Sequence, residues 1–451
     1  MEYNYISEMM SDNPIWKGGL AFSPNKKAND LTVGDDKTLD VLLYKYEIIS
    51  LIAYHLSLSE TGLVSRNISR EILKTLSEMY QLNPKDLGSS EDVHSFVEES
   101  FMKANQQAGA YLRTLLSRNE QSHTDIRLFS IDELLNLKIK LLEASFKVKS
   151  VKAKESMVMP GFTHYRQAMP LTWTTYLDYV SSVLLEGALR TSEIIDGLKE
   201  LPLGYGSGFG NDILLNWEEV ANSLGMRKSD SNPFHEASFR GLDEMRILDL
   251  LKEIMLRLSR IAQDLIMWSS DDVGFIHLPL EYVTGSSLMP NKKNPDFLEM
   301  LEGYASQVMS DSLFASTELI SKSSGYHRDF QISKWKVILS IRLVGQIAEN
   351  FGDLIYGINF DARRAREILL NSSYATGYAA TLVSRGMPWK EAYTRVGSMI
   401  EKGSMIPEYK IRNYEHTKRT KIKNELEKTK KEIEKRKAQY SFLINRAVSF
   451  E

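Results

Sequence analysis

The sequence predicts an all-α protein whose centre is a bundle of long helices. In residues 246–267, apolar residues recur three or four positions apart without an interrupting glycine or proline. Extended signals are few and short, and they are confined to residues 158–162 and 279–284. Long amphipathic helices pack into bundles, and any apolar face left over can contact a partner. The stretches with helical periodicity are 132–156, 171–199, 246–267 and 297–320.

Composition limits the classes of function. The chain has 451 residues, enough for about three domains of roughly 150 residues each. Its formal net charge is −3, which gives no reason to expect a nucleic-acid or anionic-membrane partner. The absence of cysteine excludes disulfides, thiolate nucleophiles and cysteine metal sites. No continuous apolar run is long enough to span a membrane and no secretory signal is visible, so we expect a cytoplasmic protein.

The two ends of the chain have distinct compositions. Residues 14–36 are rich in Gly, Pro, Asn, Asp and Lys, and are predicted to form an extended arm. Residues 418–437 are strongly charged, and Glu427 with Lys431 and Glu432 with Arg436 are spaced as helical ion pairs. Glutamates alternate with the lysines, which favours a solvated helix face over a nucleic-acid patch.

The stretch 284–296, TGSSLMPNKKNPD, combines small hydroxyl residues with positive charge. Asn294 suits a helix N-cap and Pro295 suits the first helical position, so a helix is predicted to begin at Pro295. Its free N–H groups, together with Lys292 and Lys293, would form an anion site for a carboxylate or a phosphate. A capped turn with solvated lysines is the alternative at this point. The spacing does not fit the phosphate-binding loop GxxxxGK[ST].

This stretch resembles the signature loop of the fumarase/aspartase superfamily of lyases, GSSxMPxKxNP. Within that superfamily, five further segments resemble the argininosuccinate lyase family: EDVHSFVEE (91–99), LSRNEQSHTDIRL (116–128), MPGFTHYRQAMP (159–170), RLSRIAQDLIMWSSDDVGFIHLP (257–279) and YHRDFQISK (326–334). They occur in the order found in that family. The fixed positions of the signature loop are all present, as Gly285, Ser286, Ser287, Met289, Pro290, Lys292, Asn294 and Pro295.

The resemblance implies a three-domain fumarase/aspartase-type fold and a homotetramer. The expected domains are an N-terminal helical domain with an extended arm (1–108), a central helical bundle carrying the signature loop (109–356), and a small helical C-terminal domain (357–451). The central helices of four subunits would form the tetramer core, and each active site would combine segments from three subunits. The resemblance implies neither a metal nor an organic cofactor.

The implied reaction is the β-elimination of argininosuccinate to arginine and fumarate, a step of arginine biosynthesis. Such a reaction needs a base, cations over the carboxylate that receives the negative charge, and an acid for the departing nitrogen. The family pattern assigns the proton transfers to Ser286 and His164 without deciding which is the base. Lys292 would stabilise the carboxylate charge, and Glu299 would pair with His164.

The same pattern predicts further site residues. Asp92 and His94 are predicted to contact the substrate-binding residues without touching the substrate. The predicted substrate contacts are Arg118, Asn119, Thr163, Arg240, Asn294, Tyr326, Gln331 and Lys334.

Several positions depart from the family pattern. Leu115 and Leu116 replace a glycine and an arginine, and a serine of the family falls near Asp36. Tyr165, Arg166 and Met169 also differ. These positions lie around the binding end of the substrate, so they bear on substrate identity more than on reaction type.

Two alternatives therefore stay open. The first is another lyase of the superfamily, acting on adenylosuccinate, aspartate or a related adduct of fumarate. Asn291 argues against the adenylosuccinate branch, which usually has a histidine at this position. The second is a structural protein on the same scaffold, which the retention of all four predicted catalytic residues disfavours.

Overall fold

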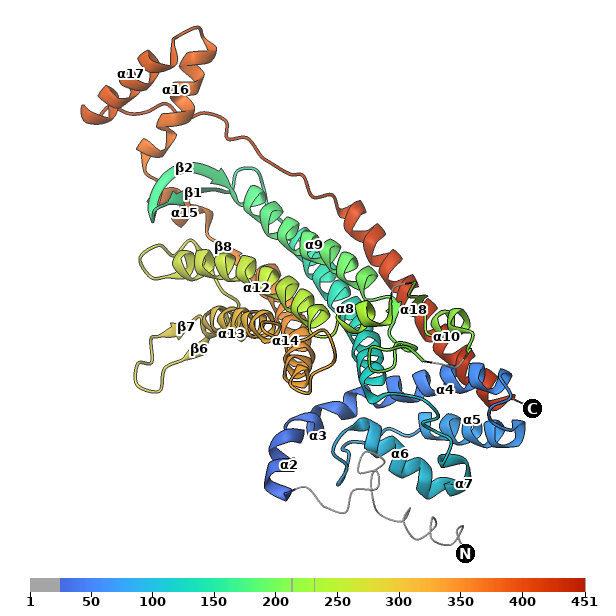
Figure 1. The fold of residues 1–451 in the computed structure, drawn as a ribbon. Coiled ribbons are helices and arrows are strands. Elements are labelled where there is room, and N and C mark those ends of the chain that lie inside the picture. The colour runs from blue at the N-terminus through green and yellow to red at the C-terminus, as the bar shows by residue number, and fades with distance from the viewer. Residues whose placement is uncertain (1–24, 212–213, 231, 451) are drawn as a thin grey trace, which may run out of the picture.

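The computed structural model describes residues 25–211, 214–230 and 232–450, and it is built around long helices (Figure 1). Helix α8 packs against α9 and α14, while α12 packs against α13, α14 and α9. The predicted all-α class and the central bundle are confirmed. The bundle helices are α8 (Arg118–Val148), α9 (Trp173–Gly197), α12 (Leu242–Ser269), α13 (Asp296–Glu318) and α14 (Phe330–Gly357).

The predicted helix over 132–156 is wrong at both ends. Helix α8 begins at Arg118, where Ser117 and Glu120 form a capping box, and it ends at Val148. Its first turns carry buried polar residues, among them His123 and Arg127, so apolar periodicity could not reveal them. Helix α14 was not predicted.

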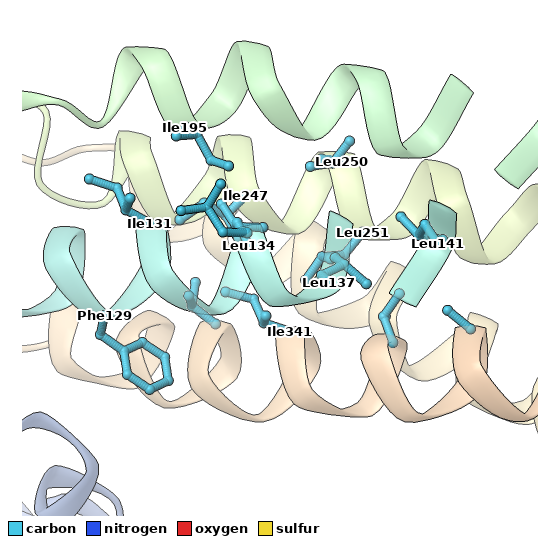
Figure 2. Close-up of a cluster of buried hydrophobic side chains, with 14 of the residues drawn as sticks. Phe129, Ile131, Leu134, Leu137, Leu141, Ile195, Ile247, Leu250, Leu251 and Ile341 are labelled. Atoms are coloured by element: carbon cyan, nitrogen blue, oxygen red, sulfur yellow. The ribbon is translucent and has the colours of Figure 1, made fainter. Parts of the chain in front are cut away.

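The apolar core lies where the bundle helices meet (Figure 2). Leu134 and Leu137 of α8 lie beside Ile247 and Leu251 of α12, with Ile341 of α14 close to them. Each fully buried side chain of this size stabilises the fold by about 1.5–3 kcal/mol. Elsewhere in the bundle, α8 and α14 approach closely enough that a Cβ added at Gly352 would lie 2.7 Å from Ala144 Cα.

The N-terminal region is helical. The predicted extended arm, 14–36, is wrong for residues 26–33, which form α2 because Asn25 caps the N–H groups of Lys27 and Ala28; residues 14–24 lie outside the described residues. The elements of this region are α2 (Lys26–Val33), α3 (Asp36–Leu39), η2 (Asp40–Leu43), α4 (Tyr44–Glu60), α5 (Arg66–Tyr80), α6 (Val93–Ala104) and α7 (Gln106–Gly109).

By length and composition alone, one stretch of this region, Asp36–Glu60, is long and apolar enough to cross a membrane. However, 78% of its most apolar window is buried inside the protein. Burial of this extent is what a core helix of a folded domain shows.

The strands are short and lie at the edges of the bundle. The predicted strand at 158–162 is confirmed as β1 (Val158–Thr163), which pairs antiparallel with β2 (Arg166–Thr172). The predicted strand at 279–284 is wrong for most of its length, because 280–282 form a 3₁₀ turn (η3). The remaining pairs are β3 (Glu200–Leu201) with β4 (Arg227–Lys228), β5 (Ile276–His277) with β8 (Asn359–Phe360), and β6 (Thr284–Gly285) with β7 (Lys293–Asn294).

Two different packing arrangements follow the bundle. The segment with α15 (Ala362–Ile368), η4 (Asn371–Tyr374), α16 (Ala375–Ser384) and α17 (Trp389–Glu401) contains a small apolar cluster of its own. Helix α18 (Arg419–Val448) instead returns to pack along α8 (Figure 1). Two short helices, α10 (Trp217–Ser223) and α11 (Pro233–Ala237), complete the fold. The three-domain division stays a prediction.

The charged C-terminal segment is helical, as predicted, but it is not wholly solvated. Arg436 is buried and donates to Asp132 Oδ1 at 2.5 Å, instead of pairing with Glu432. Glu432 pairs with Lys199 at 2.9 Å. The helical conformation was predicted correctly, but Arg436 and Glu432 each pair with a residue from another part of the fold.

Candidate active site

The predicted site residues lie at three separate places on the subunit. One group lines a pocket between the N-terminal helices and the first turns of α8 and α14. A second group is at the tip of the β1–β2 hairpin, and a third is on the loop that joins β6 to β7 and on the start of α13 (Figure 1).

The pocket has a volume of about 380 Å³. Its lining includes residues that sequence analysis did not select, namely Asp40, Glu91, Ser122 and Arg328, as well as Asp36, which was noted only as a departure. The sequence carries no signal for Asp40 or Ser122, which reach the pocket only through folding. The predicted residues that line it are Asp92, His94, Arg118, Asn119, Tyr326, Gln331 and Lys334.

Asp92 and Arg118 fix one wall of the pocket. Asp92 caps α6 by accepting from Ser95 N at 2.7 Å, and Arg118 Nη1 donates to its other oxygen at 3.2 Å. Burial acts to raise the pKa of Asp92, but His94, Arg118 and the Ser95 N–H together hold it well below its usual range. The charged carboxylate thus ties the start of α6 to the start of α8, where Asn119 lies.

His94 connects the pocket to a buried acidic pair. Its Nδ1 lies 3.1 Å from Glu47 Oε2 and 4.0 Å from Asp125 Oδ2. Burial and the neighbouring Glu47 raise the pKa of Asp125 well above its usual range. Burial also acts to raise the pKa of Glu47, but His94 lowers it. These three side chains could each offer one atom to a metal ion. The opposite directions of these two pKa shifts favour one proton shared by the pair, held by Asp125, and one negative charge on Glu47.

Lys334 and Gln331 are engaged by the N-terminal segment. Lys334 Nζ lies 2.6 Å from both Asp36 Oδ1 and Asp40 Oδ1. Burial acts to lower the pKa of Lys334, but the two aspartates raise it. Burial raises the pKa of Asp40 to about 6. Gln331 Nε2 donates to the carbonyl oxygens of residues 32 and 33 at 2.8 and 3.0 Å.

Arg240 does not line the pocket. It is buried, its Nε lies 2.9 Å from Glu244 Oε1, and its Nη1 donates to Ser122 Oγ at 3.3 Å. Ser122 lines the pocket, so Arg240 contacts the pocket lining without lining the pocket itself.

The β1–β2 hairpin holds His164 in a strained turn. Thr163 pairs with Arg166, which leaves His164 and Tyr165 as a two-residue connection. Both have positive φ, 54° and 57°, the conformation that such tight hairpins require and that asparagine or glycine adopts most easily. Strain of this kind concentrates at functional sites. Both side chains are exposed on the single subunit.

The signature loop is ordered by Ser286. Its Oγ accepts from Leu288 N at 3.3 Å and from Met289 N at 3.0 Å. Lys292 and Glu299 are exposed, and Leu288 is 84% exposed. An apolar side chain this exposed suggests that another surface covers the loop.

The predicted helix start is off by one residue and its cap is wrong. Helix α13 begins at Asp296, with Pro295 at the capping position and no side-chain capping bond. Asn294 lies in β7 and pairs with Thr284. Thr284 also donates to the Asp296 carboxylate. The strand pairing takes the backbone of Asn294 away from the helix, which a linear motif cannot indicate.

Comparison with known proteins shows the superfamily to which the chain belongs. A family profile described as "Lyase" matches residues 33–310. An EDDS lyase variant with bound fumarate has the same fold, with a TM-score of 0.71 at 19% identity, over 97% of this chain and 96% of that chain. A class II fumarase from Schistosoma mansoni has a TM-score of 0.68 at 15% identity, over 84% and 89%. Fold and profile together define a lyase of the fumarase/aspartase superfamily.

Relatives with similar sequences identify the family within this superfamily. An argininosuccinate lyase of Thermotoga neapolitana is 31% identical over 85% of this chain and 97% of the relative. One from Clostridium perfringens is 30% identical over 86% and 84%. The chain therefore belongs to the argininosuccinate lyase family.

Proposed function

We propose that the protein splits argininosuccinate into arginine and fumarate. Family membership carries this proposal, and the four predicted catalytic residues are all present in the chain. The reaction removes a proton from the carbon beside a carboxylate and then breaks the C–N bond to the guanidino group. Fumarate leaves with both succinate carboxylates, and the departing nitrogen takes up a proton. We expect the reaction to take place in the cytoplasm, as a step of arginine biosynthesis.

In this proposal, Ser286 and His164 carry the protons between them. A serine is a weak base unless its surroundings favour the alkoxide, and Lys292 on the same loop supplies positive charge for that purpose. The same charge would stabilise the carboxylate that receives electrons in the transition state. Glu299, one helical turn into α13, would hold His164 in its working protonation state.

The active site would be assembled from several subunits of a homotetramer. The hairpin tip, the loop and the pocket each carry only part of the predicted set, and His164 and Lys292 are exposed on the single subunit. Helix α13 supports this proposal with exposed apolar side chains on one face, Met309 and Leu313, which are four residues apart. Such a surface suits contact between the central helices of neighbouring subunits.

A substrate panel tests the proposed function. The purified protein should release fumarate, measured by its ultraviolet absorbance, from argininosuccinate but not from adenylosuccinate or aspartate. Release from one of the other two alone would assign the protein to a different lyase of the superfamily. No release from any of them, with the tetramer intact by light scattering, would favour a structural role.

A further inference from the structure

Asp36 presents an unpartnered carboxylate oxygen at the pocket. The side chain is only 5% exposed, and its Oδ1 accepts from Trp335 Nε1 at 2.5 Å and lies 2.6 Å from Lys334 Nζ. Within residues 25–211, 214–230 and 232–450, no side chain or backbone group donates to Asp36 Oδ2. A buried carboxylate that lines a pocket and keeps one oxygen unbound is suited to accept a hydrogen bond from a ligand.

Lys334, in contrast, is not free to bind an anion. Its ammonium group lies between Asp36 and Asp40, and the three groups sum to −1 when both carboxylates are ionised. A ligand carboxylate would have to compete with two carboxylates already held at 2.6 Å. This wall of the pocket therefore attracts cations rather than anions.

Another part of the lining offers the opposite charge. Arg328 lines the pocket and is exposed, and its guanidinium group forms no ion pair or hydrogen bond with any residue that the structure describes. Its guanidinium group can bind a carboxylate through two parallel hydrogen bonds. A pocket with a free arginine and a free aspartate oxygen matches a molecule that carries an ammonium and a carboxylate at one end.

We propose that Asp36 determines specificity by binding the α-ammonium group of the arginine half of the substrate, while Arg328 faces its α-carboxylate. This inference rests on the proposed function. A serine of the family pattern falls near Asp36, so the chain carries a charged group where that pattern has an uncharged one. A hydrogen bond between ions is about twice as strong as one between neutral groups.

The experiment runs the reaction in the direction of synthesis and follows the consumption of fumarate with two amines. Arginine carries the α-ammonium group, and 5-guanidinovalerate lacks it. A hydrogen bond to a charged group contributes about 1.5–3 kcal/mol, so the wild-type protein should prefer arginine in kcat/KM by about 10–150-fold. Asp36→Asn should reduce this preference to less than about threefold. The change should fall mainly on KM, because the ammonium group is remote from the reacting nitrogen.

The ratio between the two amines separates recognition from damage to the fold. If Asp36→Asn only disturbed Lys334 and the pocket, both amines would lose activity equally and the preference would persist, which would overturn the proposal. Asp35→Asn is the matched control, because Asp35 is the exposed neighbour, and it should keep the wild-type preference. A wild-type protein that uses both amines equally well would also overturn the proposal.

Calorimetric titration of the assembled protein with the same two amines measures their binding affinities without requiring catalysis. Tighter binding of arginine than of 5-guanidinovalerate, lost in Asp36→Asn, would support the role of Asp36 even if no fumarate were released. Absent turnover of argininosuccinate would then count against the proposed function alone. Equal binding of the two amines by the wild-type protein would count against Asp36. Agmatine lacks the α-carboxylate of arginine and therefore tests Arg328. The wild-type protein should bind arginine more tightly than agmatine, and Arg328→Gln should remove this difference.

Discussion

Lys334 Nζ and Asp40 Oδ1 lie 2.6 Å apart in the interior, and they join segments separated by 294 residues in sequence. Asp36 completes the contact from the neighbouring turn of the chain. The start of α14 is thereby fixed to the N-terminal helices, and the pocket lies between them. The same contact decides which charges a ligand meets there.

Replacement of Lys334 by methionine should strongly destabilise the protein. The change leaves two buried aspartates without their cation, and breaking a buried ion pair from one side costs about 3–5 kcal/mol. Denaturant unfolding at a fixed protein concentration measures the loss. Lys140→Met is the control, because its pair with Glu349 is partly exposed and should contribute less than about 1 kcal/mol. Equal losses in the two variants would contradict the buried arrangement.

Stability should depend on the ionisation of Asp40. Burial raises the pKa of Asp40 from 3.8 to about 6, so between these values the folded state binds a proton that the unfolded state has lost. The contribution of Asp40 is therefore fully present below pH 4 and declines as the pH rises through 6, by about 3 kcal/mol. Relative to Asp40→Asn, the wild-type free energy of unfolding should fall between pH 4 and pH 7. Asp35→Asn should track the wild type, and a parallel course for Asp40→Asn would refute the assignment.

Mixing inactive variants should restore activity if the site is shared between subunits. Ser286→Ala and His164→Ala should each lose about 10²–10⁴-fold in kcat, the contribution of a general acid or base. Hybrid tetramers of the two should regain part of the activity, because some sites then receive both intact residues from different subunits. Ser286→Ala mixed with Lys292→Ala is the control, since both residues are on one loop and no intact loop can form. Recovery in the control, or none in the first mixture, would contradict a shared site.

Two glycines of α14 should respond oppositely to alanine. Alanine favours a helix over glycine by about 1 kcal/mol, so Gly345→Ala, whose Cβ would meet only Lys140 side-chain atoms at 3.5 Å and beyond, should stabilise the protein. Gly352→Ala should destabilise it by about 1–3 kcal/mol, because the new Cβ would lie 2.7 Å from Ala144 Cα in α8. Thermal unfolding of both variants compares the effects. Stabilisation by Gly352→Ala would show that α8 and α14 pack less closely than described.

Predictions from sequence succeeded where the signal was local. The periodicity of 246–267 predicted α12, because a helix with one buried face repeats every three or four residues. The strand at 158–162 was predicted from a local extended signal, and it is present as β1. The first half of α8 was missed, since His123 and Arg127 are buried there by partners such as Asp243 that lie more than 100 residues away. The helix start near Asn294 was displaced by a strand pairing that no linear motif encodes.

The sequence by itself determined the helical bundle and the reactive residue types, because periodicity, capping and the spacing of a loop motif are properties of neighbouring residues. It also determined the family, through segments that occur in a fixed order. Only the tertiary structure decided that Lys334 is held between Asp36 and Asp40, and that Asp36 lines the pocket. The reason is physical: the charge that a pocket presents depends on which ions folding has already paired, and those partners lie far apart along the chain.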